Sequence, residues 1–139
     1  MVLMVDDSDD DCLLIKMAVG RAERLHFIGS VSDGEEVVEF LSGTGKFADR
    51  VQFPLPDLLL LDLMMPRKNG FEVLKWLQTQ PFADMLVVVL SGSEHPEDIK
   101  QAIKLGAHSY HSKELDGSKR DDLIKLLEQY LVDAKRAGK

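Results

Sequence analysis

The chain has 139 residues, of which 45% are hydrophobic, and this length fits one globular domain with its own core. Its net charge of −7, from 24 acidic and 17 basic residues, argues against a nucleic-acid backbone as the primary partner. A single cysteine excludes a disulfide framework and suits a reducing cytosol. No apolar stretch approaches the roughly 20 residues that span a bilayer, and the opening VLMVDD does not resemble a secretory signal. We therefore expect one cytoplasmic domain over residues 1–139, without a membrane contact.

Short apolar runs alternate with segments of helical periodicity, which is typical of βα units around a parallel sheet. The apolar runs predict five strands, at Val2–Asp6, Phe27–Val31, Asp57–Asp62, Leu86–Ser91 and Ser109–Ser112. Caps and periodicity predict five helices: from Ser8 to about Gly20, from Ser32 or Asp33 through Leu41, from near Phe71 to before Pro81, from Pro96 to Gly106, and one carrying Leu123, Leu126, Leu127, Tyr130, Leu131 and Ala134.

Two segments depart from this alternation. The connection before the third strand is too long for a typical αβ loop and carries two glycines and two prolines. We interpret residues 43–56 as an insertion, which is either an ordered flap or, in the favoured interpretation, a helix extension followed by a loop. Residues 135–139 are expected to form a flexible tail.

Acidic residues follow two of the predicted strands. Asp6 and Asp7 come after the first apolar run, and Asp62 comes after the third. If these runs are neighbouring parallel strands, the acids converge at the sheet edge where open α/β sheets bind ligands. Such a cluster suits a hard divalent cation, and Mg²⁺ typically takes only one or two carboxylates and keeps several waters. The simpler alternative is that acids at this point only stabilise a helix N-terminus, and we interpret residues 9–11 in that way.

Two further polar residues are expected at the same edge. Ser91 ends the fourth apolar run and Lys113 follows the fifth. A phosphoryl group on Asp62 would need a cation and Lys113 to balance its charge, and the Ser91 hydroxyl to donate a hydrogen bond. Taken alone, Ser91 could be a cap and Lys113 a solvated surface residue. The coincidence of all these positions at strand ends favours a phosphoryl site.

With these motifs in place, the chain resembles the receiver domains of two-component response regulators. The motifs are VDD at Asp6 and Asp7, LLLLDLMMPRKNG around Asp62, VVVLSGS around Ser91, and GAHSYHSK ending at Lys113. The resemblance covers essentially the whole chain. It implies a flavodoxin-like, doubly wound (βα)5 fold with a five-stranded parallel sheet of order 2-1-3-4-5.

The resemblance also implies a chemistry and a partner. Asp62 would accept a phosphoryl group from the phosphohistidine of a sensor histidine kinase or a histidine phosphotransfer protein. Mg²⁺, for which Mn²⁺ can substitute, would be held by Asp7, Asp62 and the Met64 carbonyl, with Asp6 acting mostly through a metal-bound water. Lys113 would assist this self-catalysed transfer, so the expected protein is a phosphoacceptor rather than an enzyme.

The family further suggests how a signal leaves the site. Ser91 would move toward the phosphoryl group and Tyr110 would reorient inward with it. This movement would favour one of two conformations of a protein surface at a distance from Asp62. That surface is expected on the fourth helix, the fifth strand and the last helix, where a partner or a second copy would bind. The simpler interpretation of Tyr110 is a half-buried strand aromatic with its hydroxyl in water.

Three positions bear on how this chain differs from its family. Glu114 stands where the family usually has a proline, and a cis peptide is disfavoured there by about 2.5 to 4 kcal/mol. Met64 and Ser93 occupy positions that tune the phosphoryl lifetime in the family. Because an apolar Met64 cannot orient an attacking water, we hypothesise slow or moderate self-dephosphorylation.

The PRKNG motif and the long segment before the third strand are similar to single-domain regulators that partner phytochrome-type kinases. We therefore expect a stand-alone receiver. The main alternative is a receiver-like module that binds partners without phosphoryl turnover. An aspartyl phosphatase is disfavoured because DLMMP lacks the second carboxylate of a DxDxT motif. A flavodoxin-like nucleotide binder is disfavoured because the first loop lacks phosphate-cradling glycines.

Overall fold

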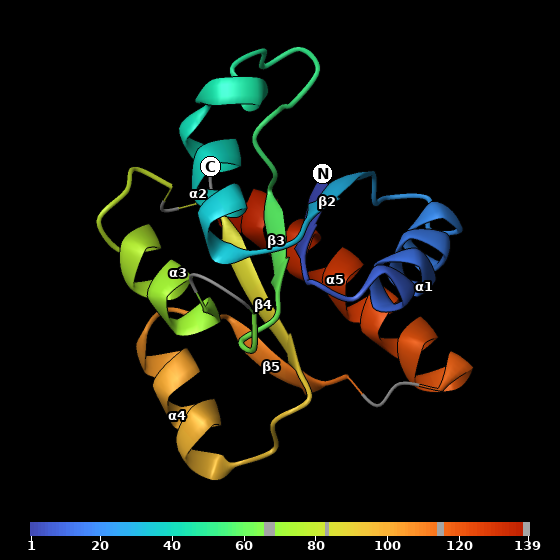
Figure 1. Cartoon of the computed structure of the whole chain (residues 1–139). Helices are drawn as coiled ribbons and strands as arrows, with labels where there is room; N and C mark the ends of the chain where they lie inside the picture. The colour runs from blue at the N-terminus through green and yellow to red at the C-terminus, as the bar shows by residue number, and fades with distance from the viewer. Residues whose placement is uncertain (66–68, 83, 114–115, 138–139) are drawn as a thin grey trace.

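Strands and helices alternate along the chain in the computed structural model, which describes residues 1–65, 69–82, 84–113 and 116–137 (Figure 1). The strands are β1 (Val2–Val5), β2 (Phe27–Val31), β3 (Leu58–Leu61), β4 (Leu86–Ser91) and β5 (Ser109–Ser112). The helices are α1 (Asp9–Gly20), α2 (Gly34–Ser42), α3 (Gly70–Leu77), α4 (Pro96–Lys104) and α5 (Gly117–Ala137), with a short 3-10 turn η1 (Gly45–Phe47). The first and third strands are shorter than predicted. The flanking acids Asp6, Asp57 and Asp62 were included in the prediction but lie outside β1 and β3.

All five strands are parallel and lie in the order β2-β1-β3-β4-β5. The predicted flavodoxin-like, doubly wound α/β fold is therefore confirmed. β1 and β3 are neighbours in register, with Val5 opposite Leu61. Backbone pairing continues past the strands, since Asp6 N donates to the Val31 carbonyl at 3.0 Å and Asp62 N to the Val5 carbonyl at 2.9 Å. The two acids consequently leave the sheet side by side.

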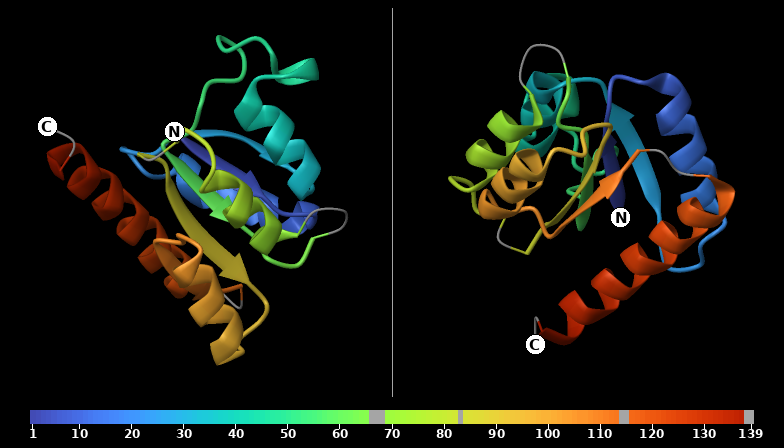
Figure 2. Two further views of the ribbon diagram at one scale, coloured as in Figure 1. Left: turned by 90° about the vertical axis from the view of Figure 1, so that its left-hand side faces the viewer. Right: turned by 90° about the horizontal axis from the view of Figure 1, so that it is seen from below.

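Helices cover both faces of the sheet, with α1 and α5 on one side and α2, α3 and α4 on the other (Figure 2). Successive strand residues alternate between the two faces. One core contains Leu3, Val5, Leu59, Leu61, Val87 and Val89, and the other contains Val2, Met4, Leu58, Leu60, Val88 and Leu90. Because the three central strands are buried on both sides, their sequences are continuous apolar runs.

Side-chain caps fix the starts of three helices. Ser8 Oγ accepts from the third helical N–H of α1, and Asp33 Oδ1 does the same for α2. Asn69 and Glu72 form a reciprocal capping box at α3. α4 differs, because His95 stands at its N-cap position without a side-chain hydrogen bond to the helix. The start of α4 is therefore held by other contacts.

The segment 43–56 is anchored to the end of α2 by Arg50. Its Nη1 donates to the Phe40 carbonyl at 2.8 Å and its Nη2 to the Leu41 carbonyl at 2.6 Å. A third bond joins Nη1 to the Phe53 carbonyl at 3.2 Å. Gly43 ends α2 in the left-handed region at φ 68°, and a Cβ there would lie 2.9 Å from Arg50 Nη2. The glycine thus permits both the turn and the close approach of the guanidinium.

Aromatic packing completes this anchor. The rings of Phe40, Phe47 and Phe53 pack against each other with centroid separations of 4.9, 5.8 and 5.1 Å. Such tilted and edge-to-face pairs are the favoured aromatic geometries. The segment therefore forms an ordered loop with one 3-10 turn at the amino end of β3, away from the predicted phosphoryl site (Figure 1).

The last helix is longer than its apolar stripe indicated. α5 continues to Ala137, so residues 135–137 of the predicted tail are helical, and residues 138–139 lie outside the described residues. Among the residues that the structure describes, no helix combines the length and the apolar character needed to cross a bilayer.

Candidate functional site

Three carboxylates converge at the carboxyl end of β1 and β3. Asp6, Asp7 and Asp62 each place a carboxylate oxygen within 4.8 Å of the others. Asp6 and Asp62 are both only 3% exposed, whereas Asp7 is exposed. The sheet register produces this convergence, because the residues after Val5 and Leu61 leave neighbouring strands at the same level. The sequence-based grouping of these acids is therefore reproduced by the fold.

Backbone N–H groups orient the two buried carboxylates. Ser8 N donates to Asp6 Oδ1 at 2.9 Å, and Met64 N donates to Asp62 Oδ1 at 3.1 Å. In each case the donor lies two residues after the acid, so the carboxylate closes a local turn. The second oxygen of each carboxylate remains available for a cation.

Lys113 supplies that cation from the end of β5. Its Nζ lies 2.8 Å from Asp6 Oδ2 and 2.9 Å from Asp62 Oδ2, and its side chain is 20% exposed. The backbone sets its direction, since Lys113 N donates to the Ser91 carbonyl at 3.0 Å and continues the β4–β5 pairing. One ammonium thus serves two buried carboxylates from different strands.

Burial and neighbouring charges shift the pKa values of Asp6 and Lys113. Burial raises the pKa of Asp6, although Lys113 and the Ser8 N–H partly oppose the effect. Burial alone would lower the pKa of Lys113, but its bonds to Asp6 and Asp62 outweigh it and raise that pKa. Lys113 is therefore fully protonated near neutral pH and acts as a fixed positive charge.

Asp11 also belongs to the cluster, which corrects the interpretation of residues 9–11 as helix-stabilising charges only. Its Oδ2 lies 3.3 Å from Lys113 Nζ, with the Asp11 side chain 40% exposed. Asp11 is the third residue of α1, directly after the Ser8 cap, so its place in the sequence indicated only a charge at a helix N-terminus. Sequence reasoning missed it because the direction of α1 relative to β5 is a tertiary property.

The donor set of the cluster fits a hard divalent cation. The candidate metal ligands at this point are the carboxylates of Asp6, Asp7 and Asp62, without thiolate or imidazole among the described metal-ligating groups. This oxygen chemistry favours Mg²⁺ or Mn²⁺ over softer metals. Lys113 contacts three carboxylates, those of Asp6, Asp11 and Asp62, and Asp7 adds a fourth carboxylate to the cluster. A divalent cation would add positive charge to this acidic group.

Ser91 and Tyr110 are connected through one loop residue. Ser91 is fully buried at the end of β4, the strand beside β3, and its Oγ accepts from Ser93 N at 3.2 Å. The hydroxyl of Tyr110 donates to the Ser93 carbonyl at 2.6 Å. Tyr110 is half-buried, as its simpler interpretation required, but its hydroxyl is bonded to protein rather than left in water.

Sequence comparison identifies the class of protein that carries this arrangement. The profile of the response regulator receiver domain family matches residues 2–128. The chain belongs to this family. The match includes all five strands and every residue of the cluster described above, so the sequence-based resemblance is confirmed.

Two curated relatives indicate how far the likeness extends. The nitrate/nitrite response regulator NarL of Escherichia coli K12 is 33% identical over 128 residues, which are 92% of this chain and 53% of NarL. The chain thus spans about half the length of that relative. Response regulator Rcp1 of Synechocystis sp. PCC 6803 is 31% identical over 114 residues, which are 81% of this chain and 76% of Rcp1.

Solved structures of response regulators superpose closely on this chain. The phosphorylated cyanobacterial phytochrome response regulator RcpA superposes with a TM-score of 0.81 at 32% identity, covering 93% of this chain and 91% of that one. The Mn²⁺-bound form of Rcp1 superposes with a TM-score of 0.77 at 26% identity, covering 94% and 92%. The receiver described here is therefore similar along nearly its whole length to phytochrome response regulators.

Gly70 is a further residue that the receiver needs at its site. A Cβ at Gly70 would lie 2.6 Å from both the Asp62 carbonyl oxygen and the Leu63 Cα, and Gly70 N donates to the Leu63 carbonyl at 3.0 Å. Its φ is not in the left-handed region, so close approach rather than backbone freedom requires the glycine. α3 thus begins directly against the backbone that presents Asp62.

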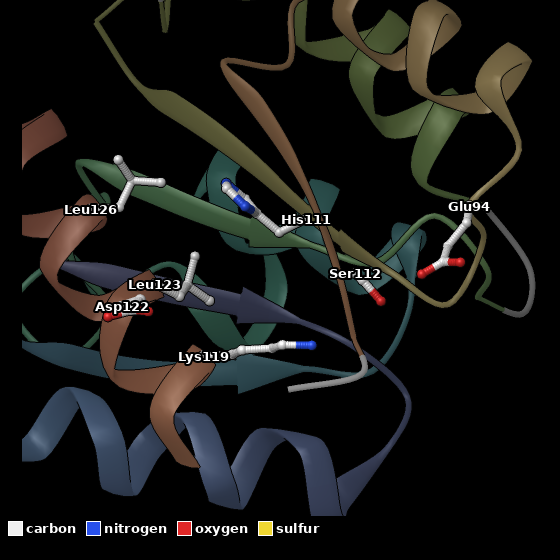
Figure 3. Close-up of a pocket in the computed structure, with 7 residues that line it drawn as sticks. All are labelled: Glu94, His111, Ser112, Lys119, Asp122, Leu123 and Leu126. Carbon is white, nitrogen blue, oxygen red and sulfur yellow. The ribbon is translucent and has the colours of Figure 1, made fainter. Parts of the chain in front are cut away.

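A pocket of about 350 Å³ opens beside the carboxyl end of β5 (Figure 3). Glu94 of the β4–α4 loop borders it on one side, and Lys119 and Leu123 of α5 border it on the other. His111 and Ser112 of β5 form its floor, and burial lowers the pKa of His111. The pocket therefore touches the predicted output face and the segment leading to Lys113.

Some predicted features of the receiver lie outside the described residues. These are Glu114, which replaces the usual proline, and residues 66–68 of the PRKNG motif. Met64 is described, and its apolar side chain is 66% exposed.

Proposed function

We propose that the receiver accepts a phosphoryl group on Asp62 from the phosphohistidine of a sensor histidine kinase or a histidine phosphotransfer protein. One observation carries the proposal: Lys113 Nζ binds Asp62 Oδ2 at 2.9 Å within a cluster of carboxylates in which Asp6 and Asp62 are buried. An ammonium fixed beside a carboxylate supplies positive charge where a dianionic phosphoryl group forms. Membership in the receiver family supports the same reaction.

In the proposed transfer, a carboxylate oxygen of Asp62 attacks the phosphorus atom. The bond between phosphorus and the imidazole nitrogen breaks, and that nitrogen keeps the electron pair. The ring, protonated at its other nitrogen, leaves as neutral imidazole, and Asp62 carries an acyl phosphate. Lys113 pairs with a phosphoryl oxygen, and the Ser91 hydroxyl donates a hydrogen bond to another.

The proposed metal ligands are Asp7, Asp62 and the Met64 carbonyl, with Asp6 acting through a water. Mg²⁺ bound there would supply positive charge against the phosphoryl oxygens. The oxygen-only donor set supports this assignment, and Mn²⁺, the ion bound to Rcp1 in its solved structure, would substitute. The chain's own contribution is to hold the carboxylates together through the β1–β3 register.

The partner we propose is a phytochrome-type histidine kinase. The similarity to RcpA and Rcp1 supports it, because RcpA is a cyanobacterial phytochrome response regulator. We further propose that the output face of the receiver comprises α4, β5 and α5. That face would bind a partner protein or a second copy of the chain.

The deciding experiment is intact mass spectrometry after incubation with acetyl phosphate and Mg²⁺, for wild type and Asp62→Asn. We expect a gain of about 80 Da, the mass of one phosphoryl group, that requires Mg²⁺ and is absent in the variant. Size-exclusion chromatography of the same samples tests the homodimer. No adduct, together with no response of Tyr110 to beryllofluoride, would favour a module that binds partners without phosphoryl turnover.

The decay of that adduct tests the proposed lifetime. The exposed, apolar Met64 side chain offers no group to orient a water toward Asp62. We therefore expect the phosphoryl group to persist for minutes or longer after removal of acetyl phosphate, whereas decay within seconds would contradict this proposal.

A further inference from the structure

Ser93 is the centre of a hydrogen-bond network that joins three parts of the fold. Its N–H donates to Ser91 Oγ at 3.2 Å, and its carbonyl accepts from the Tyr110 hydroxyl at 2.6 Å. Its own Oγ donates to Asp98 Oδ2 of α4 at 2.5 Å. These four residues are called the Ser93 network below. Strand β4, strand β5 and helix α4 are thereby tied to a single loop residue.

The beginning of α4 depends on this network. His95 occupies the N-cap position without a side-chain cap, and Ser93 Oγ instead accepts from His95 N at 3.4 Å. Asp98, at the third helical position, accepts a short hydrogen bond from the Ser93 hydroxyl through its carboxylate. The Ser93 hydroxyl therefore joins the loop to the first turn of α4 through these two hydrogen bonds.

The Ser91 hydroxyl can serve the phosphoryl site and the network together. A serine hydroxyl has one hydrogen to donate and two lone pairs to accept. Ser91 Oγ uses a lone pair for Ser93 N, so its hydrogen remains available for a phosphoryl oxygen on Asp62. Because Ser91 is fully buried, a movement of its side chain is transmitted to the Ser93 backbone.

We propose that Ser93 and Asp98 are positioning residues that couple helix α4 to the hydroxyl of Ser91. The inference rests on the proposed phosphorylation of Asp62 and adds the connection by which it reaches α4. When Ser91 turns toward the phosphoryl group, Ser93 follows, and the Ser93–Asp98 bond carries the first turn of α4 with it. The Ser93 hydroxyl donates its one hydrogen to Asp98, so its principal role is this coupling rather than control of the phosphoryl lifetime.

The same movement reaches the pocket beside β5. Glu94 directly follows Ser93 and borders that pocket opposite Lys119 of α5 (Figure 3). A displacement of the β4–α4 loop therefore changes the shape and charge of the proposed output face. Tyr110 lies on β5, and its hydroxyl donates a hydrogen bond to the Ser93 carbonyl. The position of the Tyr110 side chain is therefore coupled to that of the β4–α4 loop.

The test is hydrogen exchange of the α4 amides before and after saturation with beryllofluoride and Mg²⁺, which mimic the phosphoryl group. In wild type we expect the amide exchange rates of residues 97–104 to change at least about threefold. In Asp98→Ala and in Ser93→Ala the change should fall by more than half, while acetyl phosphate still produces the adduct. The double variant should match Ser93→Ala, because loss of the Ser93 hydroxyl already removes its bond to Asp98.

Glu97→Ala is the matched control, since Glu97 is an exposed acid on the same turn of α4 and should leave the response intact. Asp98→Asn retains an acceptor oxygen and should restore part of the response. The inference is overturned if α4 responds equally in wild type and Asp98→Ala, or if Ser93→Ala changes the phosphoryl lifetime but not the α4 response. An absence of adduct in wild type would instead refute the proposed function, and the inference with it.

Discussion

The two ends of the parallel sheet are held by different chemistry. At the carboxyl end, one ammonium from Lys113 contacts the carboxylates of Asp6, Asp11 and Asp62. At the amino end, the guanidinium of Arg50 binds three backbone carbonyls inside a cluster of phenylalanine rings. At the carboxyl end, the ion pairs of Lys113 can rearrange when a metal ion or a phosphoryl group binds. At the amino end, the carbonyls are neutral and bind neither group, so this end acts as a fixed scaffold.

The largest effect should come from removing the ammonium. We expect Lys113→Ala to lower the free energy of unfolding of the metal-free protein by about 3 kcal/mol, because two buried carboxylates lose their cation. Millimolar Mg²⁺ should restore most of this loss, since a metal at the same carboxylates replaces the missing charge. Urea unfolding with EDTA and with Mg²⁺ measures both values.

The exposed Lys119 provides the control for this substitution, and Lys119→Ala should change the free energy of unfolding little in either condition. A Lys113→Ala variant that gains no more stability from Mg²⁺ than wild type would show that the carboxyl end is not held by exchangeable charge.

A methyl group at Gly70 should be nearly as costly. Its Cβ would lie 2.6 Å from the backbone at Asp62 and Leu63, which cannot move without shifting the carboxylate cluster. We expect Gly70→Ala to lower the free energy of unfolding by about 2 to 3 kcal/mol. We also expect it to slow phosphoryl uptake at Asp62. Gly20→Ala, where a Cβ meets nothing within 4 Å, should be neutral or slightly stabilising in the same urea titration.

The amino-end anchor should affect stability without affecting the site. Arg50→Ala removes three hydrogen bonds from carbonyls at the end of α2 and in the following loop. We expect a loss of about 2 kcal/mol in the free energy of unfolding, independent of Mg²⁺. The rate of adduct formation with acetyl phosphate should stay within about twofold of wild type. A loss of uptake as large as that of a site variant would mean that the two ends are coupled.

The smallest effect is expected at the tyrosine hydroxyl. Tyr110→Phe removes the hydrogen bond to the Ser93 carbonyl and should cost about 1 kcal/mol. Asp62 should still form the adduct, but the beryllofluoride-induced change in α4 hydrogen exchange should diminish. Tyr130→Phe is the matched control, because its ring contacts His108 on the opposite side of the sheet. Equal effects of the two substitutions would argue against a specific role for Tyr110.

Much of the candidate site followed from local sequence. Asp6, Asp62 and Ser91 each stand at or just beyond the end of an apolar run, and Lys113 follows the short predicted strand Ser109–Ser112. Parallel strands bring their carboxyl ends to one edge. Asp11 was misinterpreted because its three-residue acidic run satisfies helix N-terminus chemistry equally well. The steric role of Gly70 and the hydrogen bond of Asp98 could not be predicted from local sequence, since each depends on a contact with another part of the chain.

The sequence by itself determined the alternation of strands and helices, the start of the first helix at Ser8, and the acids available to one sheet edge. Periodicity and capping are short-range effects, so they can be read along the chain. Only the tertiary structure decided which groups share the Lys113 ammonium, how Arg50 anchors the loop and how Ser93 connects β4 to α4. These contacts join residues of separate elements, and their geometry depends on how the helices pack on the sheet.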